Sequence, residues 1–170
     1  MNLSWLKLSY KMEMKSFFEK ISTEIENAVK KDINKILKEI GKERVYAIAF
    51  FTDSDCITLY LAINTYEYMN KKDHEYIELL QDKLSEEYIK KVKEGSCSIT
   101  KWNPAEWGYS DESNSNLAEV NKLLFSEEEE NPAEYEKNID LFFEAVTSAF
   151  QRLIQFKVFG QDLEEVTYFI

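Results

Sequence analysis

The stretch VYAIAFFTDSDCITLYLAI, residues 45–63, decides the fold of this chain. Its first seven residues are apolar and favour β-structure, which is typical of a strand that is covered on both faces. Residues 52–55, with the sequence TDSD, have the composition of a turn. Residues 56–63 form a second β-prone run, so the stretch predicts a β-hairpin.

Helical periodicity flanks this hairpin on both sides. Apolar residues recur at helical spacing from Ser16 to Ile40, and Gly41 stands where a C-terminal cap belongs. After the hairpin we expect a second amphipathic helix, with its apolar stripe over residues 77–88 and its end at Gly95.

The last third of the chain adds further helices. Residues 117–124 predict a short helix, and Glu127–Glu130 is expected to be a surface loop. A long helix should begin at Pro132, because Asn131 is a good N-cap and Glu134 completes a capping-box pattern.

The remaining segments complete an α+β prediction. Residues 97–102 and 166–170 are short β-prone runs. Residues 1–13 alternate between apolar and polar side chains, which indicates either an edge strand or an extension outside the fold. We therefore expect one α+β domain over residues 14–170, with a small, mainly antiparallel sheet, two long amphipathic helices and one or more shorter helices.

Charge is the most informative bulk property. The 170 residues include 21 Lys and Arg against 32 Asp and Glu, a net charge of −11. Residues 102–170 hold 15 of the acidic and 4 of the basic side chains. Such a field repels nucleic-acid phosphate and anionic lipid and attracts cationic partners. We therefore expect neither nucleic acid nor a membrane as a partner.

The cysteines and the N-terminus indicate a cytoplasmic protein. Cys56 and Cys97 are expected to be free, inert thiols of a reducing compartment, because no CxxC pair or basic neighbourhood activates them. No apolar run approaches the length of a membrane span. Lys7 interrupts the apolar part of the N-terminus, which argues against a secretory signal.

The segment WNPAEWGY, residues 102–109, is the main candidate for a binding site. Neither helical nor strand periodicity explains its two tryptophans and its tyrosine. One interpretation is that Trp102, Trp107 and Tyr109 anchor a loop on the core. The other is a recognition patch that includes Glu106, because Trp and Tyr are enriched at binding hot spots. The sequence leaves both open.

Other polar groups are weaker candidates. Glu127, Glu128, Glu129 and Glu130 form either a docking patch for a basic partner or a solvated loop. His74, the single histidine, lies one helical turn before Glu78, but one histidine makes neither a zinc site nor a triad. No glycine-rich phosphate loop is present. We therefore assign no catalytic residue, metal or cofactor.

The chain resembles a bacterial family known as domain of unknown function 4303 over about residues 14–170. The resemblance rests on the Val45–Phe51 strand with its Thr52-Asp53 turn, on Asn64-Thr65-Tyr66-Glu67 and on Trp102-Asn103-Pro104-Ala105-Glu106-Trp107. The helix that ends at Phe159-Gly160 and a final strand complete it. The family has no established activity or catalytic residues. Its members resemble the small acidic immunity proteins that are encoded beside bacterial toxins, which implies a protein-binding role.

The leading hypothesis is a non-enzymatic immunity or antitoxin protein that neutralises a basic toxin through its acidic last third. One alternative is an enzyme that uses carboxylates such as Asp53, Glu67 and Glu106, with or without a divalent metal. Another is a regulatory domain whose aromatic loop lines a small-molecule pocket.

Overall fold

The predicted hairpin is present and forms the centre of the sheet. The structure is a computed structural model that describes residues 3–110, 115–160 and 166–170, with side chains from Tyr10 onward. Strand β1 (Val45–Thr52) pairs antiparallel with β2 (Leu59–Thr65). Strand β2 begins three residues later than expected, because Asp53 accepts hydrogen bonds from the Ile57 amide and the Thr58 hydroxyl and so lengthens the turn.

Two short strands extend this hairpin into a mixed sheet of order β3-β2-β1-β4. Strand β3 (Tyr109–Ser110) pairs antiparallel with β2, and β4 (Thr167–Phe169) pairs parallel with β1. The α+β prediction is confirmed, with one parallel pair in the sheet. The prediction of a strand at residues 97–102 is wrong, because these residues form bends and turns.

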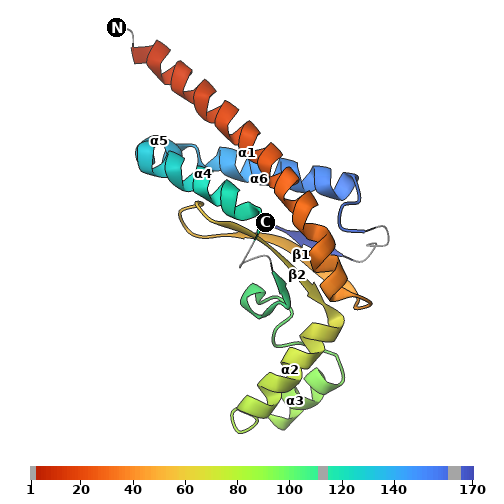
Figure 1. The fold of residues 1–170 in the computed structure, drawn as a ribbon. Coiled ribbons are helices and arrows are strands. Elements are labelled where there is room, and N and C mark those ends of the chain that lie inside the picture. Colours follow the sequence, from red (N-terminus) through yellow and green to blue (C-terminus); the bar gives the residue numbers. More distant parts are fainter. Residues whose placement is uncertain (1–2, 111–114, 161–165) are drawn as a thin grey trace.

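Four helices cover one face of the sheet (Figure 1). They are α1 (Leu3–Ile40), α4 (Leu117–Glu130), α5 (Pro132–Lys137) and α6 (Ile139–Gln155). Helices α2 (Tyr66–Leu80) and α3 (Glu86–Lys93) extend from the lower end of the hairpin, and a 3-10 turn, η1 (Pro104–Glu106), precedes β3. None of the helices in the described ranges is long and apolar enough to cross a membrane.

Helix α1 overturns the edge strand considered for residues 1–13. The helix already begins at Leu3, and its first turns extend past the other helices in Figure 1. The physical reason is composition: residues 1–14 contain no β-branched residue, and residues 1–40 contain no Gly or Pro. Leu, Met and Lys favour helix, so a helix formed downstream can propagate to this end.

Three other helix boundaries also differ from the prediction. In place of the second expected helix there are two helices, α2 and α3, which are separated by a turn at residues 81–84. Glu127–Glu130 is the end of α4 rather than a loop, since Glu is a good helix former. The long helix from Pro132 is broken at Asn138, whose backbone leaves the helical region.

The predicted capping box at the start of α5 is not formed. Asn131 makes no side-chain cap. Its side-chain Nδ2 instead donates to Glu127 Oε1 at 2.9 Å, and its Oδ1 accepts from the Tyr10 hydroxyl at 2.7 Å. Asn131 therefore joins α4 and α1 at this corner.

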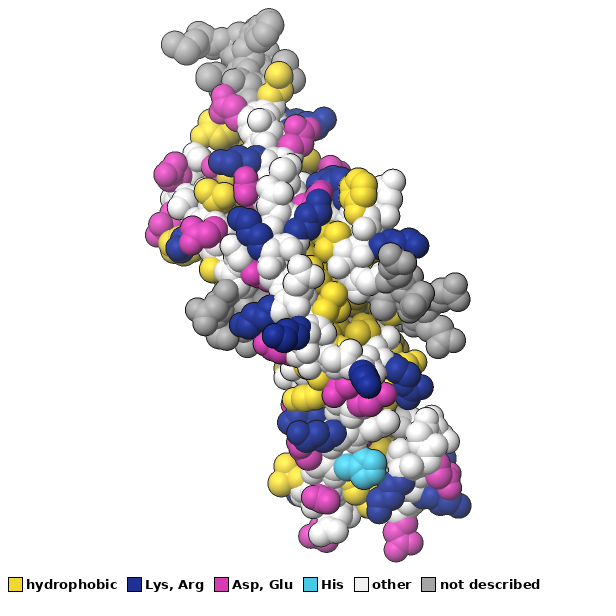
Figure 2. Space-filling model, turned by 45° about the vertical axis from the view of Figure 1, so that its right-hand side comes forward, with side chains coloured by type: hydrophobic (Ala, Val, Ile, Leu, Met, Phe, Trp, Pro, Cys, Tyr) yellow, Lys and Arg dark blue, Asp and Glu magenta, His cyan; other side chains and the backbone are white. Residues whose placement is uncertain are grey.

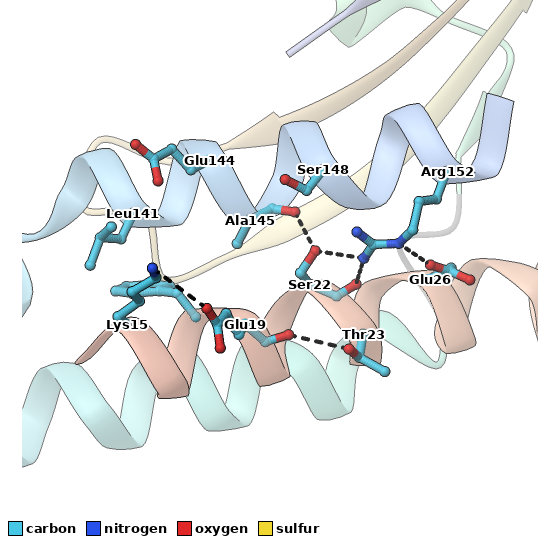
Figure 3. Close-up of a pocket in the computed structure, with 11 residues that line it drawn as sticks. Lys15, Glu19, Ser22, Thr23, Glu26, Leu141, Glu144, Ala145, Ser148 and Arg152 are labelled. Carbon is cyan, nitrogen blue, oxygen red and sulfur yellow. Dashed lines mark hydrogen bonds and ion pairs between the residues drawn. The ribbon is translucent and has the colours of Figure 1, made fainter. Parts of the chain in front are cut away.

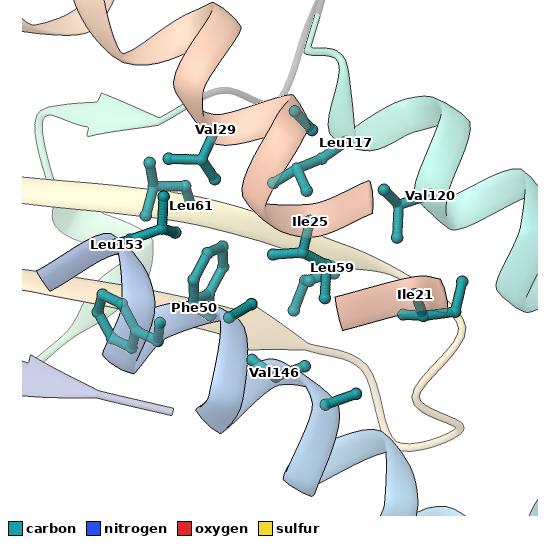
Figure 4. Close-up of a cluster of buried hydrophobic side chains, with 14 of the residues drawn as sticks. Ile21, Ile25, Val29, Phe50, Leu59, Leu61, Leu117, Val120, Val146 and Leu153 are labelled. Carbon is teal, nitrogen blue, oxygen red and sulfur yellow. The ribbon is translucent and has the colours of Figure 1, made fainter. Parts of the chain in front are cut away.

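The main core lies between the sheet and the helices that cover it (Figure 4). Ile21, Ile25 and Val29 of α1 meet Val146 and Leu153 of α6 above the sheet. Leu117 and Val120 of α4 close the same layer, and Phe50, Leu59 and Leu61 contribute from the strands of the hairpin. A smaller cluster on the opposite face of the sheet contains Tyr46, Ala47, Ala49, Ala62, Met69 and Trp107.

Candidate functional site

The tryptophan segment lies against the second face of the sheet and is partly structural. Trp107 is 8% exposed and packs beside Ala47 and Ala49, whose small side chains leave room for the indole. Trp102, in contrast, is 55% exposed. The two tryptophans therefore have different roles: Trp107 anchors the segment, and Trp102 is available to a partner.

A buried polar network fixes the position of this segment. The Tyr46 hydroxyl donates to the Lys101 carbonyl at 2.8 Å and accepts from Asn64 Nδ2 at 2.9 Å. The Asn64 Oδ1 atom accepts from the Gly108 amide at 3.4 Å. Burial raises the pKa of Tyr46 above its ordinary value, so its hydroxyl stays protonated as a donor. Asn64 is fully buried and thus ties the hairpin to the segment.

The other two candidate residues of this segment make internal hydrogen bonds. Tyr109 donates to Glu43 Oε2 at 2.8 Å, and burial together with this carboxylate raises the pKa of Tyr109 to about 12. Glu106 accepts from the Tyr76 hydroxyl at 2.5 Å, which raises the pKa of Tyr76. These contacts hold the segment against α2 and against the connection between α1 and β1, so both side chains support the site rather than form its open surface.

An aromatic groove opens between this segment, the end of β1 and α6. It has a volume of about 480 Å³. Trp102 and Phe143 are its exposed rims, at 55% and 40% exposure, together with Ile170 at 49%. The full lining, which defines the aromatic groove below, is Phe50, Phe51, Thr52, Trp102, Pro104, Trp107, Phe143, Phe169 and Ile170. Such a lining favours an apolar ligand or side chain.

Two polar side-chain atoms of the aromatic groove lack a hydrogen bond. They are Trp107 Nε1, a donor, and Thr52 Oγ1. The thiol of Cys56 is the polar neighbour of the Thr52 hydroxyl, and sulfur is a weak hydrogen-bonding partner. A buried polar group without a good partner destabilises the protein by about 1–3 kcal/mol.

An acidic groove lies on the other side of the hairpin turn. It has a volume of about 610 Å³ and combines Asp55, Glu128 and Glu136 with an apolar floor. Its full lining, which defines the acidic groove below, is Ser54, Asp55, Glu128, Pro132, Ala133, Tyr135, Glu136 and Ile139. None of these lining residues is basic.

Tyr135 shows how closely the carboxylates gather at this groove. Its side chain is buried and its hydroxyl donates to the Cys56 carbonyl at 2.6 Å. Burial raises the pKa of Tyr135, and the negative charges of Asp53, Glu128 and Glu127 add to the rise. The turn of the hairpin and the end of α4 therefore place their acidic groups around one point.

The four consecutive glutamates do not act as one patch. Glu128 lines the acidic groove, whereas Glu127 accepts a hydrogen bond from Asn131. Glu129 and Glu130 are exposed at the end of α4. The sequence located the acidic region but not the contribution of Asp55 and Glu136.

The two grooves adjoin each other. Ile139 of the acidic groove and Phe143 of the aromatic groove are four residues apart in α6, which places them on one face of the helix. At the start of the hairpin turn, Thr52 lines the aromatic groove and Ser54 lines the acidic groove. An acidic and an apolar surface therefore lie side by side.

The carboxylates considered for an enzyme occupy separate places. Asp53 bonds within the hairpin turn, whereas Glu67 lies at the opposite end of the hairpin and pairs with Arg44 at 3.1 Å. Burial opposes ionisation of Glu67, but hydrogen bonds from the Arg44 backbone and side chain lower its pKa overall. Strands of this length span about 25 Å, so the carboxylates of Asp53 and Glu67 are far apart.

In the described part of the chain, no group of three or more His, Cys, Asp or Glu side chains is placed to hold a metal ion. His74 is exposed on α2, where Figure 2 shows it on the surface, and its Nδ1 contacts the Asn70 carbonyl at 2.7 Å. His74 is therefore a solvated side chain of α2.

A third groove, of about 400 Å³, lies between α1 and α6 (Figure 3). Arg152 crosses it and donates to Glu26 at 2.6 Å and to the Ser22 hydroxyl at 2.8 Å. Ser22 in turn donates to the Ala145 carbonyl at 2.8 Å. The polar groups at its centre bond to one another, so this groove is a clamp between two helices.

Sequence comparison yields one finding. A family model described as "Domain of unknown function (DUF4303)" matches residues 25–170, which include both grooves and exclude the first 24 residues. The curated proteins hold no match, and neither do the solved structures.

Proposed function

The chain belongs to the DUF4303 family, and we propose that it is a non-enzymatic protein-binding domain whose partner is a basic protein. In this proposal the acidic groove and the aromatic groove form one docking surface. The role we propose is that of a cytoplasmic bacterial immunity or antitoxin protein that neutralises a basic toxin, as the sequence resemblance implies.

The observation that carries the proposal is the adjacency of the two grooves. Asp55, Glu128 and Glu136 give the acidic groove a negative charge that no lining Lys or Arg offsets. The neighbouring aromatic groove supplies exposed Trp102 and Phe143. Charge complementarity raises the association rate, and buried aromatic side chains slow dissociation, so the pair has the composition of a protein interface.

The partner would carry Lys or Arg beside a large apolar side chain. Its basic side chains would enter the acidic groove, and its apolar side chain would enter the aromatic groove. Because the attraction acts between charges in solvent, association should slow as salt is added, and most of this slowing should be complete once the Debye length has shortened to about 10 Å.

The test begins with co-expression of this protein and the product of the neighbouring gene. We expect a complex, and relief of any toxicity of that product. In surface plasmon resonance the triple variant Asp55→Lys, Glu128→Lys, Glu136→Lys should associate about tenfold more slowly than the parent at low salt, with little change in dissociation.

A matched control reverses charge elsewhere. Glu78→Lys with Asp82→Lys changes two exposed acidic residues at and just after the end of α2, which extends from the end of the hairpin opposite to its turn (Figure 1), and should leave the association rate close to that of the parent. The proposal fails if the two sets of variants slow association equally. It also fails if the purified protein turns over a substrate and loses that turnover in Glu106→Gln or Asp53→Asn with the fold intact.

A further inference from the structure

The backbone of Leu59 reveals which way the opposite residue of the hairpin faces. The Leu59 amide donates to Asn121 Oδ1 at 2.8 Å, and Asn121 Nδ2 donates to the Leu59 carbonyl at 3.1 Å. Both backbone groups of Leu59 therefore point away from β1. In an antiparallel pair this makes Leu59 and Thr52 a non-hydrogen-bonded pair, so the N–H and C=O of Thr52 also point outward, to the side on which β4 lies.

Strand β4 stops before it reaches Thr52. Its last paired residue, Phe169, stands opposite Ala49, and β1 continues for three more residues. Asn121 covers the edge of β2 at Leu59, but nothing described covers the edge of β1 at Thr52 in the same way. The end of β1 is thus an open strand edge, which is a template for pairing with another strand.

This open edge faces the aromatic groove. Thr52 and Phe50 line the groove, and Phe169 and Ile170 form its border at the end of β4. The Thr52 hydroxyl, whose polar neighbour is the Cys56 thiol, and the buried Trp107 indole N–H belong to residues of the same lining. An apolar groove therefore adjoins backbone groups of β1 that need hydrogen-bond partners.

We propose that the aromatic groove receives an extended peptide segment of the protein partner, which adds to β1 at Thr52 as a short strand. This inference rests on the proposed function and names the mode of binding. An extended peptide presents alternating N–H and C=O groups to an open edge, while its side chains fill the pockets beside that edge.

The neighbouring acidic groove defines the composition of the segment. Thr52 and Ser54 are two residues apart, so the two grooves lie within about 7 Å along an extended chain. The segment therefore carries a large apolar side chain for the aromatic groove and a Lys or Arg about two residues away for the acidic groove.

The experiment uses the peptide acetyl-Lys-Lys-Val-Phe-Val-amide as a probe of ¹⁵N-labelled full-length protein. We expect saturable NMR shifts of the Thr52 amide and of the Trp107 indole N–H. Two control peptides carry N-methyl groups, one at the phenylalanine and one at both valines. In an added strand, the N–H groups of every second residue point toward the neighbouring strand. One of the two control peptides should therefore bind about tenfold more weakly than the parent peptide, and the other should bind with the same affinity as the parent.

Matched protein variants test the place of binding. Trp102 and Phe143 lie at the exposed rims of the aromatic groove. The substitutions Trp102→Ala and Phe143→Ala should each lower the affinity for the peptide about tenfold. Phe125→Ala removes a side chain of similar exposure on α4, outside both grooves, and should have no effect. Thermal melting curves check that each variant is folded.

The inference is overturned if both N-methylated peptides bind as tightly as the parent, since the binding would then not use the strand edge. It is also overturned if the peptide shifts only resonances of Asp55 and Glu128. In that second case recognition of a basic partner stands, so the failure of this inference is distinguishable from failure of the proposed function.

Discussion

The ring of Tyr68 lies directly against Gly108: a Cβ atom on Gly108 would come within 2.5 Å of Tyr68 Cγ. This contact joins the helix that follows β2 to the tryptophan segment. The crowded atom is at the stem of the tyrosine ring, so rotation of a flexible end cannot relieve it. The requirement for glycine here is one of space.

Substitution Gly108→Ala should therefore destabilise the protein by about 1–3 kcal/mol, the usual cost of an overpacked site. Urea denaturation measures the change. In the background Tyr68→Ala the ring is gone and the same substitution should cost much less. Equal costs in the two backgrounds would show that the Tyr68 ring is not the cause.

A second prediction concerns Asp73, a buried acid of α2. Its Oδ1 accepts from the amides of Ile99 and Thr100 and from the Thr100 hydroxyl, at 2.9–3.0 Å. Asp73→Ala leaves the Ile99 amide and the Thr100 hydroxyl without this acceptor and should cost about 3 kcal/mol, whereas the Thr100 amide keeps its bond to Ser98 Oγ at 3.2 Å. Asp73→Asn keeps the acceptor oxygen and should cost about 1 kcal/mol. Thermal unfolding followed by tryptophan fluorescence compares the two, and equal losses would contradict the role of this oxygen.

A third prediction is the pH dependence of the clamp between α1 and α6. Hydrogen bonds from Lys30 and Arg152 lower the pKa of Glu26 in the folded protein. The ionised form therefore stabilises the fold above the unfolded pKa of about 4.3, and this contribution is lost as the pH falls through the lower folded pKa.

Glu26→Gln should accordingly lower the stability by about 1 kcal/mol at pH 7 and by less at pH 3. Urea midpoints across this range give the comparison. Glu19→Gln is the control on the same helix, because the Glu19 side chain is 69% exposed and its distance to Lys15 is 4.0 Å. A pH profile of Glu26→Gln parallel to that of the parent would argue against the clamp.

The fourth prediction separates the two free thiols. Cys56 is buried, and burial raises its pKa, whereas Cys97 is partly exposed. Native protein at pH 7 should react with a thiol reagent at Cys97 first, and Cys56 should react only after unfolding. Mass spectrometry of the modified chain identifies the site, and rapid modification of Cys56 in folded protein would refute the assignment.

The central hairpin could be predicted because its signal is local. A run such as residues 45–51 is apolar enough to require cover on both faces, and the turn that follows contains Asp and Ser. The boundary at Asn131 could be predicted from the Asn-Pro pair, and α5 begins at Pro132 as expected. The break at Asn138 could not be predicted in the same way, because residues 133–159 contain no Gly or Pro to mark it.

The sequence marked the tryptophan segment but could not separate its members. That Trp107 is buried depends on Ala47 and Ala49, which come from a distant strand. Phe143, by contrast, left a signal that was missed. Adjacent residues in a helix point about 100° apart, so Phe142 and Phe143 cannot both face the centre of one apolar stripe. Phe142 is buried and Phe143 lines the aromatic groove.

The parallel pairing of β1 with β4 has a consequence for folding during synthesis on the ribosome. Ala47 pairs with Thr167, so this side of the sheet stays incomplete until Thr167 and the residues after it have been synthesised. Contacts so distant in sequence close late, because the intervening chain must lose its freedom first. Phe169 borders the aromatic groove, so a nascent chain has no complete groove and cannot hold a partner prematurely.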